Sequence, residues 1–228
     1  MSTTIIQSKV DVLNNQSPEP SFGGQGGRIA IIKYNAGNVQ SVQYALQRIG
    51  VESVVTDDAA TIQQAAKVLF PGVGHANAAM EYLRERELDK IIAELKQPVL
   101  GICLGMQLMC NHSDEGDTKC LGIFDTNVQL FTPSVSKNGG MHLKVPQVGW
   151  NNIYDCQSVL FNELPDETFV YTVHSYYASL CNNTVAKTDY ILPFSAALQK
   201  DNFYGVQFHP EKSGVVGETI LKNFIQLK

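Results

Sequence analysis

The stretch around which the chain is organised reads Val99-Leu100-Gly101-Ile102-Cys103-Leu104-Gly105-Met106-Gln107. Its first half is apolar and follows Pro98, which predicts a short buried strand, and its second half predicts the start of a helix. Gly101 and Gly105 stand two residues to either side of Cys103, where small residues allow the backbone to turn sharply. Such a turn places the thiol at a helix N-terminus, which favours the thiolate. The stretch by itself fits a catalytic nucleophile and a cysteine buried for packing equally well.

The composition is that of an ordinary globular protein, with 44% apolar and 17% charged residues in a chain of 228. The net charge of −5, without a basic block, argues against nucleic-acid binding. The five cysteines are odd in number and lack C-x-x-C spacing, which argues against a disulfide framework or a zinc site and favours a reducing, cytoplasmic compartment. No apolar run approaches the roughly 20 residues that span a bilayer, so no membrane contact is expected.

Strands alternate with helices from residue 28 to residue 110, which predicts an α/β fold with a doubly wound, mostly parallel sheet flanked by helices. We expect helices at 39–49, 59–66, 78–96, 104–110 and 218–227, and strands at 29–32, 51–56, 68–70, 99–102, 168–173, 194–198 and 203–208. Residues 120–175 predict an added, mostly antiparallel β segment. Residues 1–27 are polar and glycine-rich, which predicts a disordered N-terminal extension before a domain at 28–228.

The second informative motif is His209-Pro210-Glu211, which follows the strand expected at 203–208. Pro210 keeps His209 extended, and in extended chain residues i and i+2 share a face. Glu211 is then placed to orient the His209 ring and to stabilise its imidazolium. His209 and Cys103 both stand at carboxyl ends of strands, where open α/β sheets bind ligands. Taken alone, the motif fits a surface turn better than a catalytic pair.

The third motif is Phe70-Pro71-Gly72-Val73-Gly74, between an expected strand and an expected helix. Two glycines allow a peptide N–H to turn toward a ligand, as an oxyanion donor or as part of an anion-binding nest. A phosphate loop is the alternative, but the Lys-Ser/Thr of that pattern is missing. Alone, this motif is weak evidence.

Together the three motifs resemble those of the class I (triad) glutamine amidotransferases, and the resemblance covers residues 28–228. Further segments are similar to the glutaminase subunits of imidazole glycerol phosphate synthase, which serve histidine biosynthesis: Tyr34-Asn35-Ala36-Gly37-Asn38, Pro146-Gln147-Val148-Gly149-Trp150-Asn151, His174-Ser175-Tyr176 and residues 205–214. The chain departs from the common pattern at Asn35-Ala36 and at Gln147, which puts details of a partner interface in doubt.

The resemblance implies a catalytic triad of Cys103, His209 and Glu211 that hydrolyses L-glutamine to glutamate and ammonia through a thioester. It implies oxyanion donors at the Leu104 N–H and within Gly72, Val73 and Gly74. The implied substrate contacts come from Gln107, Glu115, Ser175 and Tyr176. No cofactor and no metal are expected, since His174, His209 and Glu211 lack a recognisable ligand spacing.

The resemblance also implies a partner, a (β/α)8 synthase subunit that forms a heterodimer, receives the ammonia and makes imidazole glycerol phosphate and AICAR. Asn38, Gln147 and Trp150 fall in segments that the family places at or near this interface. We expect slow glutamine hydrolysis by the isolated chain, with the segment around Val73 needing the partner to turn an N–H inward. Three alternatives stay open: an amidotransferase that supplies another synthase, a different cysteine hydrolase of similar architecture, and a binding subunit with a silent site.

Overall fold

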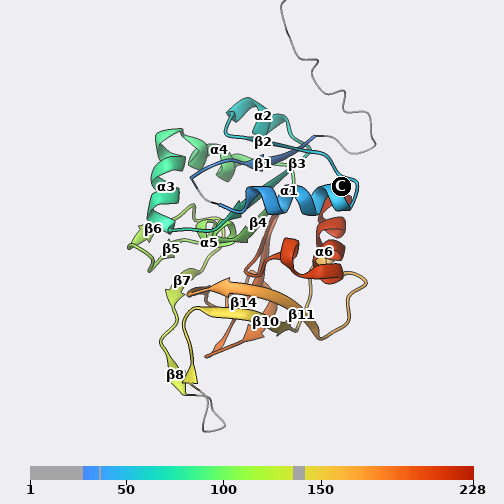
Figure 1. Cartoon of the computed structure of the whole chain (residues 1–228). Coiled ribbons are helices and arrows are strands. Elements are labelled where there is room, and N and C mark those ends of the chain that lie inside the picture. The colour runs from blue at the N-terminus through green and yellow to red at the C-terminus, as the bar shows by residue number, and fades with distance from the viewer. Residues whose placement is uncertain (1–27, 36, 136–141) are drawn as a thin grey trace, which may run out of the picture.

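The computed structural model describes residues 28–35, 37–135 and 142–228 (Figure 1). The extension predicted at residues 1–27 lies outside these ranges and stays a prediction. The described helices are α1 (Val39–Arg48), α2 (Ala59–Gln64), α3 (Ala76–Glu85), α4 (Leu88–Glu94), α5 (Leu104–Leu108) and α6 (Gly214–Gln226), with short 3-10 turns η1 (Val159–Phe161) and η2 (Pro210–Lys212). Within these residues, no helix combines the length and the apolar character that crossing a membrane requires.

A seven-stranded sheet forms the centre of the described residues, in the order β13-β14-β15-β4-β3-β1-β2. Its strands are β1 (Ile29–Ile32), β2 (Ser53–Thr56), β3 (Lys67–Gly72), β4 (Val99–Cys103), β13 (Thr184–Asp189), β14 (Pro193–Lys200) and β15 (Phe203–Val206). The strands from β15 to β2 are parallel, whereas β13 and β14 pair antiparallel at one edge. This arrangement confirms the predicted α/β fold with a mostly parallel sheet.

The central strands are mostly apolar because their side chains pack into two hydrophobic clusters, one on either face of the sheet. In β1, Ala30 and Ile32 pack in the cluster under α2, α3, α4 and α5, whereas Ile29 and Ile31 pack in the cluster under α1 and α6. Burial on both faces explains why the run at 29–32 shows no alternation of polar and apolar residues. Figure 1 shows α1 and α6 together on one side of the sheet.

The helix predicted at 78–96 is wrong as a single element, because the structure has two helices there, α3 and α4. The break lies at Arg86 and Glu87, and Glu87 adopts a left-handed conformation with a φ of 55°. Leu83, Leu88 and Ile92 are buried on both sides of the break. The step from Leu83 to Leu88 is five residues, longer than the three or four of a continuous helical face, so the apolar spacing itself changes at the break.

The segment after α5 adds the predicted, mostly antiparallel β structure. It contains β5 (His112–Ser113), β6 (Thr118–Lys119), β7 (Asn127–Leu130), β8 (Ser134–Val135), β9 (His142–Leu143), β10 (Gln147–Ile153), β11 (Thr168–His174) and β12 (Tyr176–Ala178). Only the β5–β7 pair among these is described as parallel. The β10–β11 ribbon packs against the cluster under α6 through Ile153 and Val170.

The carboxyl ends of three adjacent strands meet at one edge of the main sheet. Gly72 ends β3 and pairs in register with Cys103, which ends β4. On the other side of β4, β15 ends at Val206, three residues before His209. Neighbouring parallel strands therefore bring the three sequence motifs to one place.

Candidate active site

Cys103 ends β4 and stands directly before α5, at the turn that the sequence predicts. Its φ of 54° is unusual for a residue with a side chain and stores roughly 1–3 kcal/mol of backbone strain. The neighbouring glycines permit this turn: a Cβ on Gly105 would lie 1.6 Å from the Phe70 carbonyl oxygen, and one on Gly101 would lie 2.8 Å from the Met106 nitrogen. Close packing of strand and helix thus presents the Cys103 thiol at the edge of the sheet.

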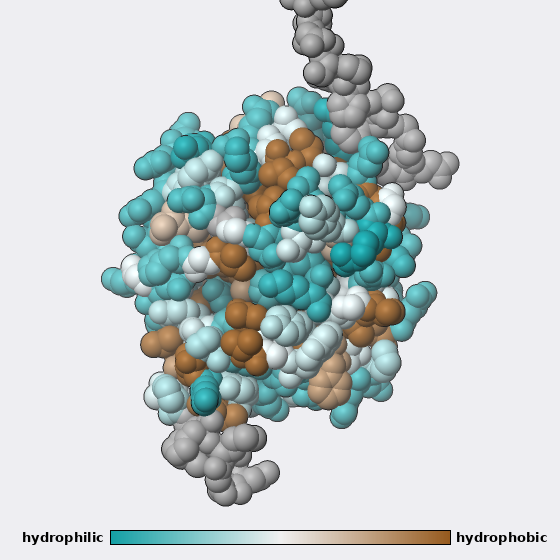
Figure 2. Space-filling model, in the orientation of Figure 1, coloured by the Kyte–Doolittle hydropathy of each residue, from teal (hydrophilic) through white to brown (hydrophobic). Residues whose placement is uncertain are grey.

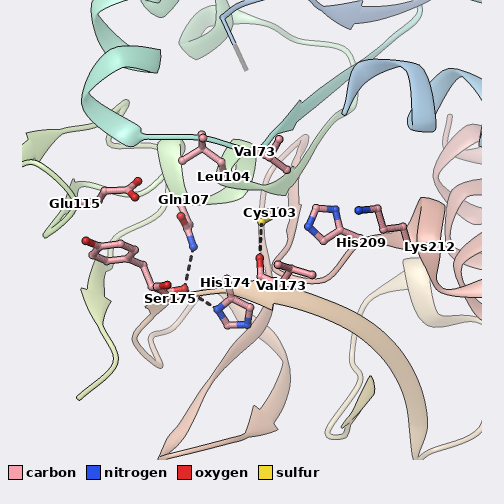
Figure 3. A pocket seen from close by; sticks show the side chains of 12 residues that line it. Val73, Cys103, Leu104, Gln107, Glu115, Val173, His174, Ser175, His209 and Lys212 are labelled. Carbon is pink, nitrogen blue, oxygen red and sulfur yellow. Dashed lines mark hydrogen bonds between the residues drawn. The ribbon is translucent and has the colours of Figure 1, made fainter. Parts of the chain in front are cut away.

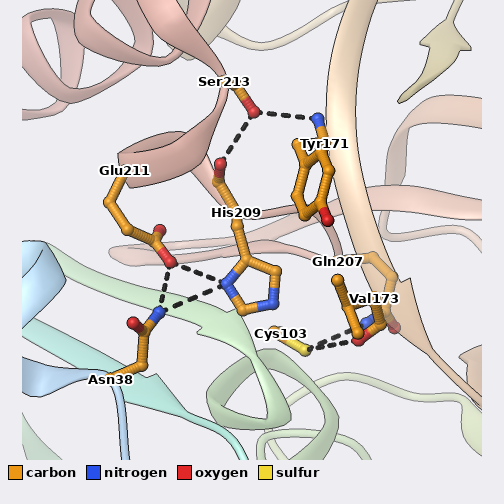
Figure 4. Close-up of polar contacts among 8 residues, drawn as sticks. All are labelled: Asn38, Cys103, Tyr171, Val173, Gln207, His209, Glu211 and Ser213. Carbon is orange, nitrogen blue, oxygen red and sulfur yellow. Dashed lines mark hydrogen bonds and ion pairs between the residues drawn. The ribbon is translucent and has the colours of Figure 1, made fainter. Parts of the chain in front are cut away.

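His209 and Glu211 lie beside Cys103 as the second motif predicts (Figure 4). His209 Nδ1 is 2.7 Å from Glu211 Oε1, and both side chains are buried. The other ring nitrogen, Nε2, faces the Cys103 sulfur. Asn38, directly before α1, donates its side-chain amide to the same Glu211 oxygen. The four side chains form one connected group.

The backbone of His209 is fixed by the β10–β11 ribbon. Its N–H donates to the Tyr171 carbonyl at 2.9 Å, and its carbonyl accepts from the Ser213 hydroxyl at 2.7 Å. The same hydroxyl accepts the Tyr171 N–H at 3.0 Å. The position of the imidazole therefore depends on β11 as well as on the main sheet.

Two opposing influences act on the His209 imidazole. Burial lowers its pKa, but hydrogen bonds to Cys103 and Glu211 and the negative charges of these groups outweigh burial. The pKa of His209 is thereby raised from its ordinary value of 6.5 to about 10. At neutral pH the ring is an imidazolium that is ready to donate a proton.

Burial is the largest influence on three other cysteines. Burial raises the pKa of Cys110 well above its ordinary value, that of Cys120 to about 12 and that of Cys156 to about 11. These three thiols are therefore uncharged and unreactive at neutral pH. Within the described ranges, no group of three or more His, Cys, Asp or Glu side chains is placed to hold a metal ion.

A cavity of about 280 Å³ opens beside the Cys103 sulfur (Figure 3). His209 and Lys212 lie on one side of it, Gln107 and Glu115 lie on the other, and the sulfur lies between them. The remaining predicted residues in its wall are Val73, Gly74, Leu104, Ser175 and Tyr176. The structure thus brings the predicted nucleophile, oxyanion and substrate residues to one cavity.

Two backbone segments border the place where an oxyanion would form. Leu104 is the first residue of α5, so its N–H has no acceptor within that helix. The other segment starts at Gly72, where a Cβ would lie 1.9 Å from the Tyr34 hydroxyl, so that only glycine fits. Gly74, two residues later, has a φ of 131°, which also favours glycine.

The wall opposite the His209 imidazole combines uncharged donors with the Glu115 carboxylate. Gln107 Nε2 donates to the Tyr176 carbonyl at 3.0 Å and to Gln207 Oε1 at 2.9 Å. His174 Nδ1 lies 2.7 Å from the same Tyr176 carbonyl. Burial lowers the pKa of His174 to about 4 in spite of this hydrogen bond. At neutral pH His174 is therefore an uncharged donor.

Among the described residues that line the cavity, Glu115 is the only carboxylate. Its Oε2 accepts the N–H of Ala76, the first residue of α3, at 2.7 Å. A Cβ on the next residue, Gly116, would lie 2.7 Å from the His75 ring, so the two loops are tightly packed. In the sequence, only the family resemblance assigned Glu115 to the site.

The residues predicted for a partner interface differ in their surroundings. Asn38 is half-buried and contacts Glu211, as described above. Gln147 is buried, and its Oε1 has no hydrogen-bond partner among the described residues. Trp150 and Val148 are 57% and 60% exposed on the β10–β11 ribbon. Figure 2 shows hydrophobic side chains at the surface over this ribbon. The interface itself stays a prediction.

Sequence reasoning missed Gln207 as a member of the site. Its amide nitrogen lies 3.7 Å from the Cys103 sulfur, and its side chain is buried. A signal was present, because Gln207 stands two residues before His209 and in extended chain shares its face. Lys212 also lines the cavity and was not predicted as a site residue.

Comparisons with known proteins agree on the family. The family model for class-I glutamine amidotransferases matches residues 30–227. The HisH subunit of imidazole glycerol phosphate synthase from Bacteroides thetaiotaomicron is 55% identical over 88% of this chain and 100% of its own length. The HisH subunit from Yersinia pestis is 45% identical over 87% of this chain and 99% of its own length.

Solved structures agree on the fold. A glutamine amidotransferase from Thermotoga maritima has a TM-score of 0.62 at 15% identity and covers 90% of this chain and 100% of its own. PurLQS from the same organism has a TM-score of 0.63 at 16% identity, with 87% of this chain and 97% of its own chain covered.

Proposed function

The chain belongs to the class-I glutamine amidotransferase family, and from this premise we propose that it is the glutaminase subunit of an imidazole glycerol phosphate synthase. One observation carries the chemistry: Cys103, His209 and Glu211 form a connected, buried group beside a cavity lined by a further carboxylate. The choice of synthase is supported by relatives that are 45–57% identical and are HisH subunits of imidazole glycerol phosphate synthase.

In the first half-reaction, the Cys103 thiolate attacks the carboxamide carbon of L-glutamine, and an electron pair of the carbonyl moves onto oxygen. The Leu104 N–H and an N–H of the segment 72–74 stabilise this oxyanion. When the carbonyl re-forms, the C–N bond breaks, and the His209 imidazolium gives its proton to the departing nitrogen. Ammonia leaves, and a γ-glutamyl thioester remains on Cys103.

In the second half-reaction, the now neutral His209 takes a proton from water, whose oxygen attacks the thioester carbon. The second oxyanion collapses, the C–S bond breaks, and glutamate leaves. The thiolate is then again paired with an imidazolium. Glu211, held by Asn38, orients the ring and stabilises its positive charge in both halves.

The walls of the cavity support an α-amino acid amide as substrate. The Glu115 carboxylate, fixed by the Ala76 N–H, offers a negative charge to an α-ammonium group. Gln107 and the backbone at Ser175 and Tyr176 supply uncharged polar contacts along the same wall. A substrate that lacks the ammonium group would leave Glu115 unpaired and bind more weakly.

The second part of the proposal concerns the ammonia. We propose that it passes to a (β/α)8 synthase subunit, which forms a heterodimer with this chain and makes imidazole glycerol phosphate and AICAR in histidine biosynthesis. Val173 lines the cavity and pairs in register with exposed Val148, next to Trp150. This continuity between cavity and exposed apolar ribbon supports docking of a partner over the site.

The test measures ammonia release from glutamine by the full chain alone, with an imidazole-forming synthase and its ligand, and with the synthase of another glutamine-dependent pathway. The proposal predicts activation by the imidazole-forming synthase alone, by more than about fivefold. Activation by the other synthase alone would make the chain an amidotransferase of another pathway. Equal rates in all three mixtures would refute a coupled partner.

A further inference from the structure

Gln207 is a buried polar side chain that the triad leaves without a role. It directly follows β15 and is 1% exposed. Its Nε2 lies 3.7 Å from Cys103 Sγ, within the distance of an N–H···S hydrogen bond (Figure 4). Its Oε1 lies 2.9 Å from Gln107 Nε2. One amide thus joins the nucleophile to a residue that lines the cavity.

The Tyr176 carbonyl determines which end of the Gln107 and Gln207 side-chain amides is the nitrogen and which is the oxygen. The Tyr176 carbonyl can only accept, so the Gln107 atom 3.0 Å from it is the nitrogen. The same nitrogen donates to Gln207, so the Gln207 atom that meets it is the oxygen. The other end of the Gln207 amide, which faces the sulfur, is therefore the NH₂ group. Gln207 is a donor to Cys103 by necessity of this network.

A donor at this position acts on the charged form of the sulfur. The Val173 carbonyl, 4.0 Å from Sγ, can accept from a thiol but cannot stabilise a thiolate. The imidazolium of His209 and the amide of Gln207 both favour the anion, one through charge and the other through a hydrogen bond. The thiolate is thus stabilised in two different ways, by the positive charge of His209 and by the amide of Gln207.

We propose that Gln207 is a further catalytic residue, whose amide N–H stabilises the Cys103 thiolate and whose carbonyl ties that thiolate to Gln107. The inference rests on the proposed function, since it concerns the same nucleophile. The amide nitrogens of Gln107 and Gln207 both donate within the hydrogen-bond network that runs from the Tyr176 carbonyl to the Cys103 sulfur. This leaves the Gln107 oxygen to accept from the substrate. A substrate glutamine that contacts Gln107 therefore affects Gln207, which donates the hydrogen bond to the Cys103 thiolate. Substrate binding is thereby coupled to the reactivity of the sulfur.

The experiment follows alkylation of Cys103 by iodoacetamide as a function of pH in the full chain. Mass spectrometry of the peptide that contains Cys103 separates it from the other thiols. The variants are Gln207→Met, which keeps length and loses both hydrogen bonds, Gln107→Met, the double variant, and Gln47→Met on the exposed surface as control. This readout needs no glutamine turnover, so it can fail independently of the proposed function.

We expect Gln207→Met to move the pH midpoint of alkylation upward by about one unit. Gln107→Met should move it less, the double variant no further than Gln207→Met, and Gln47→Met not at all. An unchanged midpoint in folded Gln207→Met would overturn the proposal, because a purely structural glutamine has no effect on thiolate formation.

The wild-type chain gives a second measurement that does not depend on a folded Gln207 variant. In nuclear magnetic resonance, the side-chain amide protons of Gln207 should shift with the same pH midpoint as alkylation of Cys103. Cys103→Ala should abolish this titration. Gln207 protons that do not respond to pH in the wild-type chain would also overturn the proposal.

Discussion

Two histidines border the same cavity and behave in opposite ways. His209 and His174 are 1% and 6% exposed, so burial disfavours the charged ring in both. The pKa of His209 is nevertheless raised to about 10, whereas that of His174 is lowered to about 4. The difference lies in their partners: His209 has a carboxylate and the nucleophile, and His174 has a backbone carbonyl and the rings of Phe131 and Phe194.

This contrast divides the cavity into a charged side, that of the His209 imidazolium, where we propose the chemistry, and a binding side, that of the uncharged His174 ring, where the Glu115 carboxylate also lies. Proton transfer needs a group whose charge is stabilised inside the protein, and only the side of Cys103, His209 and Glu211 provides this. The side of Gln107 and His174 holds its amides and its ring as uncharged donors. The predictions that follow test this division, beginning with the largest effect.

Cys103→Ala should abolish glutamine hydrolysis, with a loss of about 10⁴-fold or more, because the thioester can no longer form. Ammonia release is measured with the full chain. Cys156→Ala, which removes a half-buried thiol elsewhere, is the matched control and should keep wild-type activity. Substantial hydrolysis by Cys103→Ala would show that Cys103 is not the nucleophile.

Glu211→Gln should keep the shape of the site and remove the charge that supports the imidazolium. We expect kcat to fall by about 10²- to 10⁴-fold, with a smaller change in KM. The exposed Glu94→Gln serves as control for the same chemical change. A loss confined to KM would place Glu211 on the binding side instead.

The two histidines should change stability with pH in opposite directions. The folded pKa of His174 lies below its unfolded value, so its contribution is full above about pH 6.5 and is lost as the pH falls toward about 4. The folded pKa of His209 lies above its unfolded value, so its contribution is full below about pH 6.5 and is lost as the pH rises toward about 10.

Urea unfolding across this pH range tests the contrast with two variants. His174→Gln should reduce the loss of unfolding free energy between pH 6.5 and pH 4 by about 3 kcal/mol. His209→Gln should reduce the loss of unfolding free energy as the pH rises toward 10. Equal slopes for both variants would show that the two rings are not in opposite charge states.

Asn38→Ala should lower kcat of the isolated chain roughly tenfold, because Glu211 loses a charge-assisted hydrogen bond. The exposed Asn182→Ala is the matched control. Measured without a partner, this effect separates the contact with Glu211 from any role at an interface. A loss that appears only when a synthase is added would favour the interface role.

The sequence predicted the main sheet well because each of its strands is locally distinctive. The apolar run at 29–32 indicates a buried strand, and the glycines around Cys103 indicate a sharp turn, each within a few residues of sequence. The break between α3 and α4 was missed because Leu88 and Ile92 keep a helical spacing within α4, and the five-residue step from Leu83 to Leu88 was taken as part of the same helix. The left-handed conformation of Glu87 cannot be read from its residue type.

The site was harder to predict where a role depends on contacts between distant segments. The pair His209 and Glu211 is local, and spacing alone suggested it. Gln207 stands two residues before His209 and shares its face, but its contact with the Cys103 sulfur, like that of Asn38 with the Glu211 carboxylate, joins segments that are far apart in the sequence. The opposite pKa shifts of His174 and His209 likewise follow from burial and charge in the folded chain.

The central claim is that Cys103, on the charged side, carries the acyl group of glutamine. Acid quenching during turnover of the full chain with glutamine, followed by mass spectrometry, tests it directly. One γ-glutamyl group should be found on the peptide that contains Cys103, and none in Cys103→Ala. A γ-glutamyl group on another cysteine, or ammonia release by Cys103→Ala at the wild-type rate, would contradict it.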